Sequence, residues 1–181
     1  MSQPRFLAPE AFRRMPWKNG GGVTIEIAAA PEGAGLDAID WRVSMARVET
    51  AGPFSLFPGL DRTLAVLEGE ALTLDIEGRG TVRLDRDSVP YAFPADVAET
   101  GVPTNGGILD LNVMSRRGRW RHRVRHGDGT VDLEGDVNLL VNRGARLVLP
   151  AGELVAGGAA ILDAGSVTLA SAVYVIELFR V

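Results

Sequence analysis

The chain of 181 residues contains no cysteine and has only two histidines. The lack of cysteine excludes disulfides, zinc–thiolate sites, iron–sulfur clusters and cysteine nucleophiles. His122 and His126 lie in the run RWRHRVRH, whose alternating arginines favour a strand. On a strand the two imidazoles would share one face but lie about 13 Å apart. Because imidazole is the usual transition-metal ligand, we expect no metal and no other cofactor.

Several other classes of protein lack their sequence signals here. The net charge is -4, so we expect no nucleic-acid partner. No apolar run is long enough to span a bilayer, and MSQPRFLAPEAFRR has no apolar core of a secretory signal. No nucleophile elbow, P-loop or dinucleotide fingerprint occurs. We therefore expect a cytoplasmic protein with no membrane partner.

Short strand patterns separated by glycine-containing turns dominate the sequence. Their spacing of roughly ten residues is typical of all-β sandwiches and barrels. Only PEAFRRM at 9–15 suits a helical turn or two. We predict an all-β, cupin-like jelly roll, in a compact two-barrel arrangement. It would form a single cupin-like domain over residues 1–181, with halves of about 1–115 and 116–181. The strand patterns cover 23–28, 41–48, 63–69, 71–78, 81–85, 108–114, 138–142, 146–150 and, with glycine breaks, 159–179.

Lysine is nearly absent: of the 19 basic residues, all but Lys18 are arginine. Lys18 stands in PWKNGGG, where three glycines permit close backbone approach and expose successive N–H groups that could bind an anion. Trp17 could supply a flat wall and Asn19 both a donor and an acceptor. The alternative is a tight turn, with Trp17 in the core and Lys18 in water.

The run SRRGRWRHRVRH at 115–126 concentrates arginine around a single aromatic residue. It would suit a nucleic acid or a protein partner, but the acidic balance of the whole chain favours a solvated strand face opposite acidic neighbours. Arg116 and Arg117 directly follow an apolar strand, so one of them could turn into a cavity. The candidate acidic neighbours are Asp128, Asp132, Glu134 and Asp136.

Three longer segments resemble the HutD/Ves family of bacterial proteins. They are PWKNGGGVTIEIA at 16–28, WRVSMARVETAGPFSLFPGLDRTLAVLEG at 41–69 and ILDLNVMSRRGRW at 108–120. The resemblance extends through most of the first two-thirds of the chain, and its motifs include Phe54 and Phe57. It implies a cupin-like fold, a link to bacterial histidine utilisation, and binding of a pathway intermediate such as formylglutamate or urocanate.

Strand alternation narrows the choice of residues that could contact a ligand. Arg42 and Ser44 share one face of WRVSMA. A buried arginine needs an anionic partner, which would be either a ligand carboxylate or a carboxylate of the chain such as Glu26. Arg62 follows a Pro-Gly turn and either reaches the same mouth or, with Asp61, only fixes the turn.

The sequence thus favours a non-enzymatic protein that binds a small anionic metabolite and modulates histidine degradation. The alternative is a metal-independent cupin-type isomerase or hydrolase with Lys18 or Glu26 as its acid or base. The sequence leaves a homodimer open. The predicted ligand-binding residues are Trp17, Lys18, Asn19, Gly20, Gly21, Arg42, Ser44, Arg62, Asn112 and Arg116.

Overall fold

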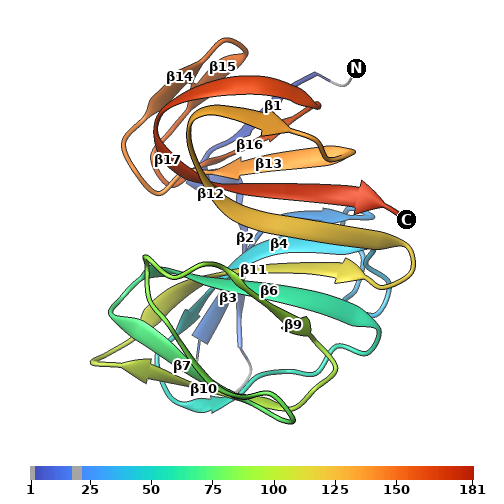
Figure 1. The fold of residues 1–181 in the computed structure, drawn as a ribbon, viewed down its shortest axis with the longest axis vertical. Coiled ribbons are helices and arrows are strands. Elements are labelled where there is room, and N and C mark those ends of the chain that lie inside the picture. Colours follow the sequence, from blue (N-terminus) through green and yellow to red (C-terminus); the bar gives the residue numbers. More distant parts are fainter. Residues whose placement is uncertain (1–2, 18–21) are drawn as a thin grey trace. The chain divides into compact units, whose positions relative to one another are not determined.

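The computed structural model describes residues 3–17 and 22–181, and these form two compact units (Figure 1). One unit is Arg13–Arg117, and the other joins Met1–Phe12 to Gly118–Val181. Both units consist of antiparallel strands, as the strand patterns predicted. None of the described helices is long and apolar enough to cross a membrane.

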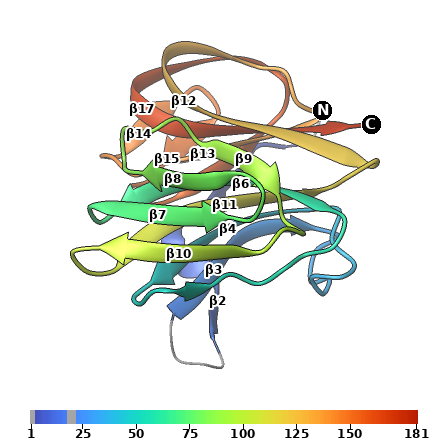
Figure 2. The same cartoon turned by 60° about the horizontal axis from the view of Figure 1, so that its bottom comes forward.

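The unit Arg13–Arg117 is built from two antiparallel sheets. The larger sheet has the order β2-β3-β4-β11-β6-β9, and the smaller one has the order β5-β10-β7-β8. Figure 2 shows β8, β7 and β10 side by side. The strands of the larger sheet are β2 (Arg13–Pro16), β3 (Gly22–Ala30), β4 (Trp41–Val48), β6 (Leu60–Glu68), β9 (Tyr91–Pro94) and β11 (Ile108–Arg116). Those of the smaller sheet are β5 (Gly52–Pro53), β7 (Ala71–Ile76), β8 (Gly80–Leu84) and β10 (Glu99–Thr104).

One hydrophobic core joins the two sheets of this unit. Side chains alternate along each strand, so every second residue of β4, β6 and β11 points to the smaller sheet. Val48, Val66 and Ile108 from the larger sheet pack with Leu72 and Leu74 of β7. Within the described residues the sheets are not closed into a barrel, and the two-barrel detail therefore stays a prediction.

The second unit is organised around two long neighbouring strands, β12 (Trp120–Leu133) and β17 (Gly165–Arg180). Its main sheet has the order β1-β16-β13-β17-β12, and β14 pairs with β15. The first residues of the chain belong here because β1 pairs antiparallel with β16. The remaining strands are β1 (Arg5–Leu7), β13 (Val137–Val141), β14 (Leu147–Leu149), β15 (Gly152–Leu154) and β16 (Ala159–Leu162).

The predicted helix at 9–15 is wrong beyond its first turn. Pro9–Ala11 forms a single 3-10 turn, but Arg13–Pro16 is strand β2. Its residues pair antiparallel with β3, with Met15 opposite Thr24. Pairing with β3 therefore overrides the helical pattern of this short segment.

The arginine-rich strand β12 is neutralised mainly by a carboxylate that the sequence analysis missed. Glu177 of β17 is fully buried and accepts hydrogen bonds from Arg123 (2.7 Å) and Arg125 (3.1 Å). Of the predicted acidic neighbours, Glu134 pairs with Arg123 at 2.6 Å, whereas Asp132 offers its backbone oxygen to Arg125. Burial acts to raise the pKa of Glu177, but the hydrogen bonds from Arg123, the Glu134 N–H and Arg125 outweigh it and hold that pKa below its ordinary value.

Replacing Glu177 with glutamine should destabilise the protein. The variant loses the shared counter-charge of two arginines, and because these are a third to a half exposed we expect a loss of about 1–3 kcal/mol at neutral pH. A lowered folded-state pKa stabilises above the unfolded pKa, so the difference from wild type should shrink as the pH falls through the acid range. Urea denaturation at several pH values measures it.

The matched control is Glu153→Gln, which breaks the exposed pair between Arg146 and Glu153 at 3.2 Å. We expect a change below about 1 kcal/mol because exposed pairs contribute little. Equal losses in the two variants would contradict the role given to Glu177.

Candidate functional site

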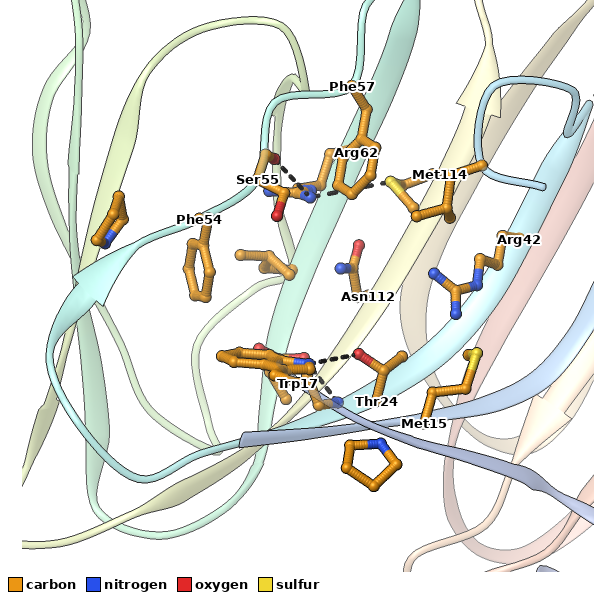
Figure 3. A pocket seen from close by; sticks show the side chains of 16 residues that line it. Met15, Trp17, Thr24, Arg42, Phe54, Ser55, Phe57, Arg62, Asn112 and Met114 are labelled. Carbon is orange, nitrogen blue, oxygen red and sulfur yellow. Dashed lines mark hydrogen bonds between the residues drawn. The ribbon is translucent and has the colours of Figure 1, made fainter. Parts of the chain in front are cut away.

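A cavity of about 560 Å³ lies in the unit Arg13–Arg117, against the larger sheet (Figure 3). Its walls come from strands β2, β3, β4, β5, β6 and β11, from the loop between β3 and β4, and from the segment that follows β5. The lining residues are Met15, Pro16, Trp17, Thr24, Leu36, Arg42, Ala46, Pro53, Phe54, Ser55, Phe57, Arg62, Leu64, Asp110, Asn112 and Met114.

Register explains why polar side chains of three adjacent strands meet in this cavity. On β11, Asp110 and Asn112 are two residues apart and therefore share a face. Asn112 lies opposite Ser44 of β4 and Leu64 of β6. Ser44 is buried, but it donates to the backbone oxygen of Asn112 at 3.4 Å and does not line the cavity.

Arg62 forms a buried cationic part of the wall. Its guanidinium donates to Glu99 of β10 and also to the backbone oxygen of Ser55 at 3.5 Å. The guanidinium carbon lies 5.0 Å from the ring centre of Phe57 and 5.9 Å from that of Phe54. Burial lowers the pKa of Arg62 to about 10, while nearby Asp110 acts to raise it, so Arg62 stays charged at neutral pH. Its Nε–H is buried and has no hydrogen-bond partner among the described residues.

Arg42 has the chain partner that the sequence analysis gave as an alternative to a ligand. Its Nε donates to Glu26 at 2.7 Å, and both side chains are largely buried. Arg42 still lines the cavity, and Figure 3 shows its guanidinium directed toward Asn112. The salt bridge therefore positions Arg42 at the wall without removing it from the cavity.

Asp110 and Asn112 bring two acceptor groups to the same wall. Asp110 is 1% exposed and accepts a hydrogen bond from the backbone N–H of Ala46 at 3.2 Å. Burial raises its pKa to about 7, although nearby Arg62 and the Ala46 N–H act to lower it. The Oδ1 atom of Asn112 is buried without a hydrogen-bond partner among the described residues. Buried polar atoms of this kind usually find a partner, which indicates room for a ligand or water here.

Trp17 covers part of the cavity because β2 and β3 approach closely. Its indole N–H donates to Thr24 Oγ1 at 2.8 Å, and its backbone N–H donates to Gly22 at 2.9 Å. A side chain at position 22 would collide with the backbone oxygen of Arg47 and approach the Trp17 ring to 3.0 Å. Glycine is therefore required at position 22.

Four predicted site residues, Lys18, Asn19, Gly20 and Gly21, lie outside the described residues, and their roles stay predictions. The other six can be placed. Trp17, Arg42, Arg62 and Asn112 line one cavity, whereas Ser44 is buried on the same face of β4 and is not among the lining residues.

Arg116 does not line the cavity. It is the last residue of β11, and its guanidinium turns to the loop between β3 and β4, where it donates to the backbone oxygens of Ile39 (2.7 Å) and Asp37 (2.9 Å). Arg117 instead pairs with Asp61 (3.0 Å) and Asp96 (3.2 Å). Asp61 therefore pairs with Arg117, whereas Arg62 pairs with Glu99.

Asp110 and Glu99 were not predicted as parts of the site. Asp110 had a signal, because a carboxylate two residues before Asn112 in the apolar run ILDLNVM must share its face. Glu99 had none, since it begins a different strand, 37 residues beyond Arg62. Phe54 and Phe57 belonged to the family motifs but were not assigned to the site.

The two histidines lie on β12, in the other unit, and the His126 ring packs on Tyr174 with centres 4.6 Å apart. The strand predicted for them is confirmed. Over residues 3–17 and 22–181, no group of three or more His, Cys, Asp or Glu side chains is arranged to hold a metal ion.

The fold and the cavity define an all-β, cupin-like protein with a small-molecule-sized cavity that has largely apolar walls and a few polar groups. A family model described as HutD matches residues 9–167. The chain belongs to the HutD family, which confirms the resemblance found in its motifs.

Known proteins of this group match over much of the chain. An uncharacterised 21.2 kDa protein in the hutC 3′ region of Pseudomonas putida is 38% identical over 133 residues, which cover 72% of this chain and 67% of that protein. Protein Ves from Citrobacter koseri is 38% identical over 123 residues, covering 66% and 63%. The structure of HutD from Pseudomonas fluorescens (formate condition) superposes with a TM-score of 0.88 at 26% identity, covering 98% of this chain and 99% of that one.

Replacing Glu99 with glutamine should strongly destabilise the unit that holds the cavity. The substitution leaves the Arg62 guanidinium buried without its counter-charge, and breaking a buried pair on one side costs about 3–5 kcal/mol. Thermal and urea denaturation measure the loss.

The control is Glu68→Gln, which removes the partner of Arg47 at 2.9 Å on a half-exposed surface. Its loss should stay below about 1 kcal/mol. A Glu99→Gln protein as stable as this control would show that Arg62 does not depend on Glu99.

Proposed function

We propose that this protein is a non-enzymatic binding protein for a small carboxylate intermediate of histidine degradation, formylglutamate or urocanate, and that it modulates that pathway. The observation that carries the proposal is the cavity wall, where the buried Arg62 Nε–H and Asn112 Oδ1 have no partner among the described residues. Membership of the HutD family supports the association with histidine utilisation.

The size and walls of the cavity support a small, partly planar ligand. Its volume of about 560 Å³ falls within the roughly 300–1,000 Å³ of ordinary ligand pockets. Trp17, Phe54 and Phe57 provide flat apolar walls, while the arginines and Asn112 provide a few directed polar groups. This combination is typical of sites that orient a ligand by a small number of hydrogen bonds.

The charges around the cavity support a carboxylate as the group recognised. The Arg42 side chain is held at its Nε by Glu26 and is directed toward Asn112 (Figure 3). The Arg62 side chain keeps its Nε–H for a further acceptor. Guanidinium groups bind carboxylates through charge-assisted hydrogen bonds that are stronger than neutral ones.

A binding role is favoured over catalysis by the state of the proposed acid or base. Glu26 is committed to the ion pair with Arg42 at 2.7 Å. The other candidate, Lys18, lies outside the described residues. The proposal therefore assigns Glu26 to positioning Arg42.

A thermal-shift screen at millimolar concentration should distinguish compounds that bind from those that do not. The compounds are urocanate, formylglutamate, formate and glutamate. A ligand present at 100 times its Kd stabilises by about 2.7 kcal/mol, which corresponds to a shift of several degrees. Arg42→Gln should weaken binding of the best compound at least about tenfold, because one charge-assisted hydrogen bond contributes roughly 1.5–3 kcal/mol.

The matched control is Arg47→Gln on the same strand, since Arg47 lies on the opposite face and pairs with Glu68. It should bind like wild type, and circular dichroism would confirm that both variants are folded. No stabilisation by any of the four compounds would contradict the proposal. Conversion of a compound to product, followed by NMR in the same samples, would contradict the non-enzymatic part alone.

A further inference from the structure

We propose that Asp110 makes ligand binding proton-linked, so that the cavity takes up a carboxylate together with one proton. The inference rests on the proposed function and concerns the same cavity. In the bound state the proton lies on Asp110, whose carboxyl O–H donates to an oxygen of the ligand carboxylate. The proton comes from solvent, and no covalent bond other than this O–H is formed or broken.

The charge balance of the described residues around the cavity is the first reason. Arg42 is already paired with Glu26, and Arg62 is already paired with Glu99. Asp110 lines the same cavity and has no ion-pair partner of its own within 4 Å among the described residues. These two ion pairs and Asp110 together are therefore neutral when Asp110 is protonated, and they carry one net negative charge when Asp110 is ionised. A carboxylate would enter the ionised cavity against a like charge that is shielded from water.

The surroundings of Asp110 give the second reason. From β4, Arg42 shares its face and the Ala46 N–H donates to its Oδ1. From β6, Arg62 is the charged group that faces it, and Arg62 is tied to Glu99 of β10.

The other ionisable groups of the neighbouring strands do not supply a counter-charge to Asp110. Glu26 of β3 reaches the cavity through Arg42. Arg47 and Glu68 both lie opposite Leu109, and alternation places them on the other face of the sheet. From β9, Tyr91 lies opposite Leu64 and packs against the core.

Hydrogen bonding supports the protonated form in the complex. A buried carboxylate oxygen of Asp110 already accepts from Ala46, so the other oxygen remains to hold a proton. An acid–carboxylate hydrogen bond is short and strong compared with a neutral one. Burial already raises the pKa of Asp110 to about 7 in the free protein, so protonation is accessible near neutral pH.

Calorimetric titration of the full chain with formate and with formylglutamate from pH 6.0 to 8.5 tests the proposal. Neither compound titrates in this range, whereas the imidazole of urocanate would. The affinity should be nearly constant below pH 7 and then fall toward tenfold per pH unit. Titrations in two buffers of different ionisation enthalpy should show uptake of close to one proton per ligand at pH 8 and little at pH 6.

Asp110→Asn is the informative variant, because its amide keeps an acceptor for the Ala46 N–H and a donor for the ligand but cannot titrate. It should bind at every pH about as tightly as wild type does at pH 6, with no proton uptake. Asp61→Asn is the control for the same change in net charge, since Asp61 is half exposed and pairs with Arg117. It should keep the wild-type pH dependence.

The outcomes separate the two proposals. Binding of either compound with no pH dependence and no proton uptake overturns the role of Asp110 and leaves the proposed function intact. A pH dependence that persists in Asp110→Asn also overturns it. Absence of binding of both compounds at every pH overturns this inference and the choice of formylglutamate as the ligand, while the thermal-shift screen with urocanate and glutamate decides the rest of the proposed function. If Asp110→Asn does not fold, proton uptake by the wild type decides alone.

Discussion

The buried guanidinium of Arg62 is the constraint around which the unit Arg13–Arg117 is organised. Arg62 belongs to β6 of the larger sheet, and its counter-charge Glu99 begins β10 of the smaller sheet. A charge that has left water must be paired, so the ion pair links the two sheets at the cavity. The same guanidinium lies against Phe54 and Phe57, which brings the segment after β5 over the site. One cation thus determines a sheet contact, an aromatic wall and the polarity of the cavity.

Some polar atoms of the cavity wall are bonded to other residues of the chain, and others have no partner among the described residues. Glu26 and Glu99 each use an oxygen to hold an arginine, and the Ala46 N–H holds Asp110. These bonds restrict the side chains before any ligand arrives, which lowers the entropy cost of binding. The atoms left over, such as Asn112 Oδ1, face the same space.

Local patterns predicted the strands and the inward face of the wall because both follow from alternation. WRVSMARV was predicted as a strand at 41–48 and is strand β4 with those bounds, and Arg42 lines the cavity as its face required. Ion-pair partners that lie far apart in the sequence could not be predicted in this way. Glu177 lies 54 residues from Arg123, and Glu99 lies 37 residues from Arg62, so each pairing depends on strand order that no local signal contains. Trp41, Val43 and Met45, on the other face of β4, are as deeply buried as the residues that face the cavity.

Strand β2 has features that protect the sheet edge near the cavity from aggregation. It is an edge strand of the larger sheet and lies beside residues that line the cavity. A terminal strand exposes unpaired backbone groups that invite intermolecular strand addition and amyloid-like growth. Arg13 and Arg14 place exposed charges on β2, and Pro16 removes a backbone donor at its end. A strand that helps to line the cavity can therefore lie at the edge of the sheet without offering that edge as a template for aggregation.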